Sequence, residues 1–193
     1  HDLGVLAHDS MAGRVAATPG GARARRFLLA EYARIGLRPL GASHEHAFTF
    51  SGRRDTTTRT GVNVIGYLRG TERPDRYIVV SAHYDHVAGP AVNGDSIYNG
   101  ADDDASGTAA VLEFARWFAA NPPRTSMIFA LFDAEESGLR GSRAWVQAPP
   151  VPLDSIDVAM TMDMVSHNDQ NELVAAGTNP YPFLKPYVDR VAA

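Results

Sequence analysis

The chain has 193 residues, a net charge of −4 and no cysteine. This length is sufficient for one domain with a hydrophobic core, so we predict a single domain over residues 1–193. Without cysteine, any bound metal must be held by histidines and carboxylates. Because the sequence contains no block of lysines and arginines and no apolar run of about 18 residues, we expect neither nucleic acid nor a membrane as a partner.

The spacing of apolar residues predicts alternating helices and strands. A short helix precedes the MAGR segment, and an amphipathic helix follows over 18–37. Two strands at 47–52 and 61–70 are expected to form an antiparallel pair. The later patterns predict strands at 76–85, 125–133, 156–164 and 171–177, and helices at 103–122, 137–147 and 180–191. This alternation predicts the α/β class, as a three-layer α/β/α sandwich around a mostly parallel mixed sheet.

Four polar motifs lie at the predicted strand ends or open the helix between them. They are HYD at 83–85, GADDDASG at 100–107, DAEES at 133–137 and MDM at 162–164. In open α/β sheets, ligands bind beyond the carboxyl ends of the strands. We therefore expect these motifs to meet at one edge of the sheet.

Each motif alone also has a purely structural interpretation. His83 could be an ordinary histidine at a strand end, the aspartates 102–104 could cap the following helix, and the two glutamates of DAEES could lie in a first helical turn. Asp163, flanked by two methionines at the end of an apolar strand, needs a partner for its charge. Because so many carboxylates at one edge would repel each other, we favour the interpretation that divalent cations lie among them.

The order and spacing of these motifs resemble the zinc aminopeptidases of the M28 type, which belong to the clan of co-catalytic zinc exopeptidases. The resemblance begins with the segment LGVLAHDSMAGRVAATPGGARA and continues through SAHYDHV, NGADDDASG, FDAEESGLRGS and TMDMV. It covers nearly the whole chain. It implies a zinc-exopeptidase-like fold and a catalytic domain with two zinc ions.

The resemblance also implies which residues bind the metals. His83, Asp103 and Asp163 correspond to the ligands of one zinc. Asp103 corresponds to the carboxylate that bridges both metals, and Glu136 to a ligand of the second zinc. The family has a cis peptide bond directly after the bridging residue, which here would join Asp103 to Asp104.

Two further residues are assigned to catalysis by the same resemblance. Glu135 corresponds to the general acid and base, which takes the proton of a zinc-activated water that attacks the peptide substrate and returns it to the leaving amine. Asp85 corresponds to the carboxylate that orients the imidazole of His83.

One family ligand has no counterpart in this chain, a histidine well downstream of the MDM strand. His167 follows on the wrong segment, and His86 should point away from His83 if the strand continues. We interpret these histidines as surface or structural residues, together with His1, His8, His44 and His46. We therefore expect one zinc to bind well and the second weakly. The chain then corresponds to a shortened piece of a longer enzyme, or to a protein that naturally lacks the last strands and helix, with an uncovered edge where copies could self-associate.

Three functions remain open from the sequence. The leading one is a metallo-exopeptidase that removes N-terminal residues from peptides. The second is another amide hydrolase chemistry of the clan, carboxypeptidase, dipeptidase or glutaminyl-cyclase-like, although the intact DAEES motif argues against the cyclase. The third is a non-catalytic binding domain on the peptidase fold. By analogy with bacterial relatives, we expect a periplasmic or secreted location.

Overall fold

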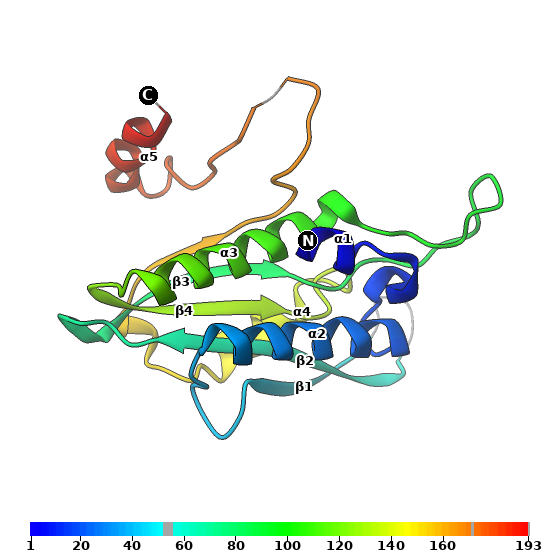
Figure 1. The fold of residues 1–193 in the computed structure, drawn as a ribbon, viewed down its shortest axis with the longest axis horizontal. Coiled ribbons are helices and arrows are strands. Elements are labelled where there is room, and N and C mark those ends of the chain that lie inside the picture. The colour runs from blue at the N-terminus through cyan, green and yellow to red at the C-terminus, as the bar shows by residue number, and fades with distance from the viewer. Residues whose placement is uncertain (52–55, 171, 193) are drawn as a thin grey trace.

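The computed structural model, which describes residues 1–51, 56–170 and 172–192, contains a five-stranded sheet in the order β1-β2-β4-β3-β5 (Figure 1). The strands are β1 (Glu45–Ser51), β2 (Thr58–Leu68), β3 (Arg73–His83), β4 (Thr125–Phe132) and β5 (Ile156–Thr161). β3 runs parallel to both of its neighbours, whereas β2 is antiparallel to both of its own. The predicted mixed α/β sheet and the antiparallel β1–β2 pair are therefore confirmed, and the carboxyl ends of β3, β4 and β5 lie at the same edge.

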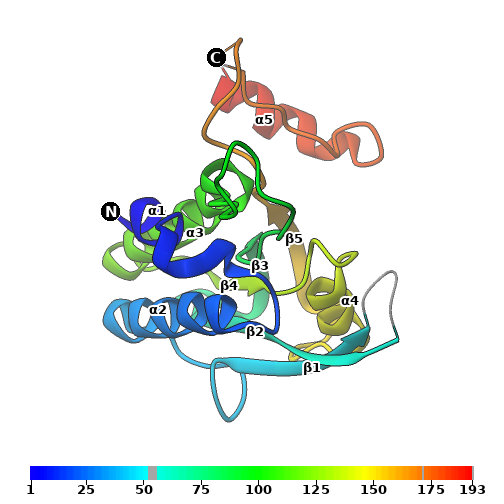
Figure 2. The same cartoon turned by 90° about the vertical axis from the view of Figure 1, so that its right-hand side faces the viewer.

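The helices form a layer on each face of the sheet (Figure 2). One face is covered by α1 (Asp2–Leu6), α2 (Pro19–Ile35) and α3 (Gly107–Ala120), and the other by α4 (Arg140–Gln147). The ends of α2 follow from its sequence, because the hydroxyl of Thr18 accepts a hydrogen bond from Gly21 N and Gly36 adopts a left-handed conformation with φ of 84°. The three-layer architecture predicted from the sequence is confirmed.

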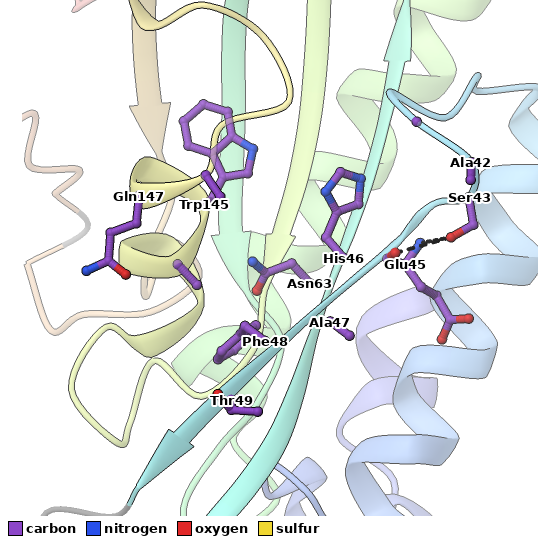
Figure 3. Close-up of a pocket in the computed structure, with 13 residues that line it drawn as sticks. Ala42, Ser43, Glu45, His46, Ala47, Phe48, Thr49, Asn63, Trp145 and Gln147 are labelled. Atoms are coloured by element: carbon purple, nitrogen blue, oxygen red, sulfur yellow. Dashed lines mark hydrogen bonds between the residues drawn. The ribbon is translucent and has the colours of Figure 1, made fainter.

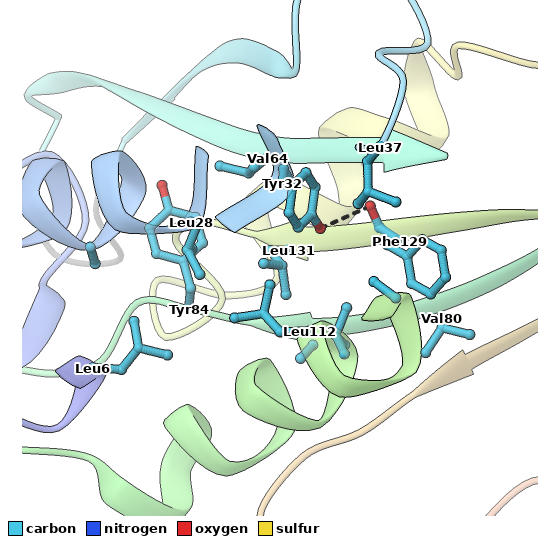
Figure 4. Packing of buried hydrophobic residues seen from close by; sticks show 14 of the residues in the cluster. Leu6, Leu28, Tyr32, Leu37, Val64, Val80, Tyr84, Leu112, Phe129 and Leu131 are labelled. Carbon is cyan, nitrogen blue, oxygen red and sulfur yellow. Dashed lines mark hydrogen bonds between the residues drawn. The ribbon is translucent and has the colours of Figure 1, made fainter. Parts of the chain in front are cut away.

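The main hydrophobic core lies between the sheet and α1–α3 (Figure 4). Leu28 and Tyr32 of α2 and Leu112 of α3 are fully buried there against the apolar side chains of β4. The hydroxyl of Tyr32 donates a hydrogen bond to Phe129 O at 3.1 Å, which satisfies the one polar atom of this side chain. A smaller core beneath α4 contains Trp145 packed edge-on against Phe132. Since a fully buried side chain of this size contributes roughly 1.5–3 kcal/mol, these two cores fix the sheet to its helices.

The chain after β5 differs from the sequence prediction. The strand predicted at 171–177 is wrong, because residues 172–177 adopt no regular secondary structure, and residue 171 lies outside the described part. Leu173 and Val174 are 76% and 83% exposed, so the apolar pattern there has no neighbouring strand to pack against. The predicted final helix is present as α5 (Lys185–Ala192), which lies away from the sheet and has no buried residue (Figure 1).

The outer strand β5 and the adjoining face of α3 expose apolar side chains. Phe114 is 39%, Trp117 59% and Met160 41% exposed. Self-association through this edge stays a prediction. No helix among the described residues is long and apolar enough to cross a membrane. Residue 52 of the predicted first strand lies outside the described part of the chain.

Candidate metal centre

His83 is the last residue of β3, and its buried imidazole faces two of the predicted carboxylates. Its Nε2 lies 3.1 Å from Asp103 Oδ1 and 3.9 Å from Asp163 Oδ1. Its Nδ1 lies 3.1 Å from the main-chain oxygen of Asp85. Because a carbonyl oxygen only accepts hydrogen bonds, Nδ1 carries a hydrogen, and Nε2 is the nitrogen that faces the two carboxylates. A metal would bind His83 through Nε2, while the hydrogen bond from Nδ1 holds the ring in place.

Asp85 joins the ends of β3 and β4. Its carboxylate accepts hydrogen bonds from the main-chain nitrogens of Glu135 at 2.9 Å and of Glu136 at 3.4 Å. Its Oδ1 is also 3.6 Å from Nδ1 of His83. Sequence reasoning assigned Asp85 to the orientation of the imidazole. The structure adds that its main-chain oxygen makes the closer contact with the ring, while its carboxylate also positions the loop that carries the two glutamates.

Asp103 lies between two imidazoles. Its Oδ1 is 3.1 Å from Nε2 of His83, and its Oδ2 is 3.9 Å from Nδ1 of His86. The peptide bond between Asp103 and Asp104 is cis, as the resemblance implied. One carboxylate with its two oxygens turned toward different histidines has the arrangement that a bridging ligand requires.

His86 corrects the prediction from the sequence. We expected its side chain to point away from His83, but its Nδ1 lies 2.8 Å from Oε1 of Glu136 and faces Asp103 as well. The reason is that β3 ends at His83, so the alternation of side chains along a strand no longer applies three residues later. The structure therefore brings His86 into the centre, whereas no described contact brings His167 there.

Asp104 holds together segments that are distant in sequence. Its buried carboxylate accepts hydrogen bonds from the main-chain nitrogens of His83, Gly107 and Met164. Burial raises its pKa to about 7, against the opposing effect of the nearby His83. The predicted capping role is thus part of its function, since Gly107 begins α3. One of its oxygens also lies within 4.8 Å of ligand atoms of His83 and Asp163.

The electrostatics of the centre favour bound cations. Burial lowers the pKa of His83, but the hydrogen bond to Asp85 and the charges of Asp104, Asp85 and Glu135 outweigh burial and raise this pKa to about 9. Burial raises the pKa of Glu135; the charge of His83 opposes this shift, and the charges of Asp85, Glu136 and Asp163 add to it. Carboxylates outnumber cationic groups near the strand ends, and a divalent metal would neutralise part of this negative charge.

Arg14 is a residue of the centre whose role sequence reasoning missed. Its guanidinium is fully buried and donates four hydrogen bonds, to the main-chain oxygens of Leu6, Tyr84, Asn99 and Gly100 at 2.6–2.9 Å. These contacts tie the N-terminal segment to the residues beside His83 and before Asp103. Burial lowers the pKa of Arg14 to about 10, although Asp104, Asp85 and Asp103 counteract this effect. The sequence offered only its position in the MAGR segment as a signal.

The donor set fits divalent zinc. Two groups of three residues place one ligand atom each within 4.8 Å of one another, His83 with Asp104 and Asp163, and His86 with Asp103 and Glu136. Imidazole nitrogens and carboxylate oxygens are ligands that zinc accepts. A separate groove of about 480 Å³ between β1 and α4 contains none of these residues and is lined by Phe48, Asn63 and Trp145 among others (Figure 3).

The fold and the centre together define an α/β protein with two clusters of imidazole and carboxylate groups, suited to divalent metal, at the carboxyl edge of its parallel strands. The model of peptidase family M28 matches residues 63–193, and the chain belongs to this family. A probable zinc metalloprotease of Pyricularia oryzae is 42% identical over 85 residues, which cover 44% of this chain and 17% of that protein. The aminopeptidase NAALADL1 of Mus musculus is 35% identical over 132 residues, which cover 63% of this chain and 16% of that protein.

Solved structures share the fold. A Zn-dependent exopeptidase from Parabacteroides distasonis superimposes with a TM-score of 0.70 and 22% identity, over 87% of this chain and 61% of that one. A glutaminyl cyclase from Fimbriiglobus ruber superimposes with a TM-score of 0.76 and 18% identity, over 99% of this chain and 68% of the cyclase. At these identities the likeness defines the fold and leaves the reaction open. The chain spans less than a quarter of the curated relatives named above.

Proposed function

We propose that this chain carries the metal-binding part of a zinc-dependent exopeptidase that acts as an aminopeptidase on peptide substrates. The observation that carries the proposal is the position of Asp103, with one oxygen turned toward His83 and the other toward His86, next to the two glutamates of the DAEES loop. Membership of family M28 supports the metallopeptidase class. The name of the mouse relative supports the choice of an aminopeptidase.

The residues of the centre divide between metal binding and proton transfer. His83, Asp103, Asp163 and Glu136 would hold zinc. When bound, zinc supplies Lewis acidity that activates water and stabilises negative charge developing on the peptide carbonyl. Glu135 takes a proton from the attacking water and returns it to the leaving amine, for which its raised pKa is suited. Asp85 holds the main chain of Glu135 and the ring of His83 in place.

The substitution Glu135→Gln tests the assignment of the general base. It keeps the shape of the side chain but removes the group that accepts the proton. We expect the hydrolysis rate of leucine p-nitroanilide to fall by about 10²–10⁴-fold, with zinc content unchanged. Glu113→Gln, at an exposed glutamate of α3, serves as the matched control and should leave the rate unchanged. Equal rates for the Glu135→Gln variant and the unmodified chain would contradict the proposal.

The same fold in glutaminyl cyclases makes cyclisation the second candidate. The two reactions differ in the substrate they need, because cyclisation consumes an N-terminal glutamine without water. Assays with an N-terminal glutamine peptide and with aminoacyl anilides separate them. We expect hydrolysis of the anilides and no loss of ammonia from the glutamine peptide. N-blocked peptides should not be cleaved, which distinguishes an aminopeptidase from the carboxypeptidase alternative.

A further inference from the structure

We propose that His86 supplies the third protein ligand of the second metal position, so that this chain by itself holds two metal ions. This inference rests on the proposed function, because it requires that Asp103 and Glu136 bind metal. It differs from the expectation that the second position has only two carboxylates and fills weakly. The ligand is an imidazole from the loop directly after β3.

The ligand atoms of His86, Glu136 and Asp103 lie close to one another. Nδ1 of His86 lies 2.8 Å from Oε1 of Glu136 and 3.9 Å from Oδ2 of Asp103. In a tetrahedral zinc site with bonds of about 2.0–2.2 Å, neighbouring ligand atoms lie roughly 3.4 Å apart. The two observed separations lie on either side of this value. Small rotations of the side chains would therefore give all three atoms equal access to one ion.

The backbone holds the imidazole ring of His86 in this place. Gly100 has a left-handed conformation with φ of 56°, and a Cβ atom there would lie 2.6 Å from Cδ2 of the His86 ring. The glycine thus leaves the space that the imidazole occupies. The main-chain oxygen of Gly100 is itself bound by the buried Arg14. The side chain of His86 is only 12% exposed, so it is already largely desolvated.

The charges around His86 also favour a bound cation. Asp103 and Glu136 place carboxylate oxygens within 4.8 Å of a ring nitrogen of His86, and Glu135 adds negative charge next to Glu136. An imidazole with its hydrogen on Nε2 presents the lone pair of Nδ1 to the same cation as these oxygens. Two carboxylates and one neutral imidazole form a donor set typical of zinc with a remaining position for water. In this chain, then, both metal positions have one histidine each, and the two histidines are three residues apart.

Zinc counting tests this proposal. The unmodified chain and the variants His86→Ala, His86→Asn and His46→Asn are titrated with zinc by calorimetry, and bound zinc is counted by elemental analysis after dialysis. The Asn variant retains an N–H that can donate to Glu136, but an amide is a poor zinc ligand. His46→Asn, on β1, is the matched control. We expect two zinc ions for the unmodified chain and the control, and one for both His86 variants, with the second dissociation constant raised more than about 100-fold.

The number of zinc ions bound per chain distinguishes a failure of this inference from a failure of the proposed function. Zero zinc in the unmodified chain would refute the proposed function, whereas one would refute only the role of His86. If His86→Asn bound the second zinc ion with an affinity within tenfold of the unmodified chain, the inference would also be overturned. His86 would then only position Glu136. A measurement on the unmodified chain keeps the test valid even where a variant folds poorly. In ¹⁵N spectra of the histidine rings, Nδ1 of His86 should shift with the second equivalent of zinc, and an unchanged resonance would overturn the proposal.

Discussion

The two sides of the metal centre are built in different ways. At the ends of β3 and β4, His83 and Asp85 are buried, and the main chain of Glu136 is hydrogen bonded to Asp85. Beyond β5, the side chain of Asp163 is 51% exposed, and Met164 has a positive φ of 52°. The side at the ends of β3 and β4 is therefore positioned by the buried interior of the sheet. The side that carries Asp163 depends on a few polar contacts.

These polar contacts come from the loop that opens α3. Asp104 accepts a hydrogen bond from Met164 N, Ser106 Oγ accepts one from Val165 N, and Asp102 accepts two from Ser166. The residues that follow have little packing of their own, as the exposed Leu173 and Val174 show. In the proposed centre the aspartate run therefore has two tasks: Asp103 would bind metal, and Asp102 and Asp104 hold the segment that carries Asp163.

The largest expected effect comes from the residue shared by both sides. Asp103→Asn replaces the bridging carboxylate with an amide that binds zinc weakly. We expect the loss of both zinc ions on dialysis and a fall in peptidase rate of more than about a hundredfold, since even residues that only support the ligands contribute 10–100-fold. Asp75→Asn, at an exposed aspartate of β3, is the control for the charge change. Zinc retention in Asp103→Asn would show that the two metal positions are independent.

The second-largest effect is expected at Arg14, on the buried side of the centre at the ends of β3 and β4. Arg14→Met leaves four main-chain oxygens without their charged donor. Because each such hydrogen bond contributes roughly 1 kcal/mol or more, we expect the free energy of unfolding in urea to fall by about 3–5 kcal/mol in the metal-free protein. Arg26→Met, at an exposed arginine of α2, should change it by less than about 0.5 kcal/mol. A small effect at Arg14 would mean that the buried side does not depend on this network.

A pH series on the metal-stripped protein tests the charge of the same side. The pKa of His83 is about 9 in the folded state and about 6.5 in the unfolded state, so the folded state holds the extra proton between these values. The contribution of this proton to the free energy of unfolding is therefore fully present below pH 6.5. It is lost as the pH rises toward 9, by at most about 1.4 kcal/mol per pH unit. Urea unfolding at pH 7, 8 and 9 measures this slope. The slope should disappear in His83→Ala, and a rising stability of the unmodified protein over this range would contradict the assignment.

The smallest effect is expected on the exposed side. Asp102→Ala removes the acceptor for Ser166 N and Oγ, which loosens the segment carrying Asp163. We expect the zinc held by His83 and Asp163 to bind about tenfold more weakly, with a loss of unfolding free energy of only about 1 kcal/mol. Asp169→Ala, at an exposed aspartate of the same segment, is the control. If Asp102→Ala destabilised the fold as strongly as Arg14→Met, the contrast between the two sides would be wrong.

The sequence predicted the parts of this molecule that local patterns control. The spacing of apolar residues predicted a strand at 76–85, present as β3, and a helix at 18–37, present as α2 and capped by Thr18 and Gly36. The topology rule that parallel strands present their carboxyl ends at one edge then placed His83 and the DAEES loop together. These predictions succeeded because period and capping are properties of neighbouring residues.

The parts that the sequence missed depend on distant contacts. The direction of His86 depends on the residue at which β3 ends, which the apolar pattern did not define. The role of Arg14 depends on carbonyl groups contributed by segments far along the chain. The short apolar run around Val174 predicted a strand, but no partner strand is present for it among the described residues. In each case the missing information was tertiary contact.

The most direct measurement is a crystal structure of the zinc-loaded chain, with anomalous scattering recorded at the zinc edge. We predict two peaks about 3.5–4 Å apart on either side of the Asp103 carboxylate, one bound by His83 and Asp163 and the other by His86 and Glu136. The absence of any peak within bonding distance of both His83 and Asp163 would contradict it.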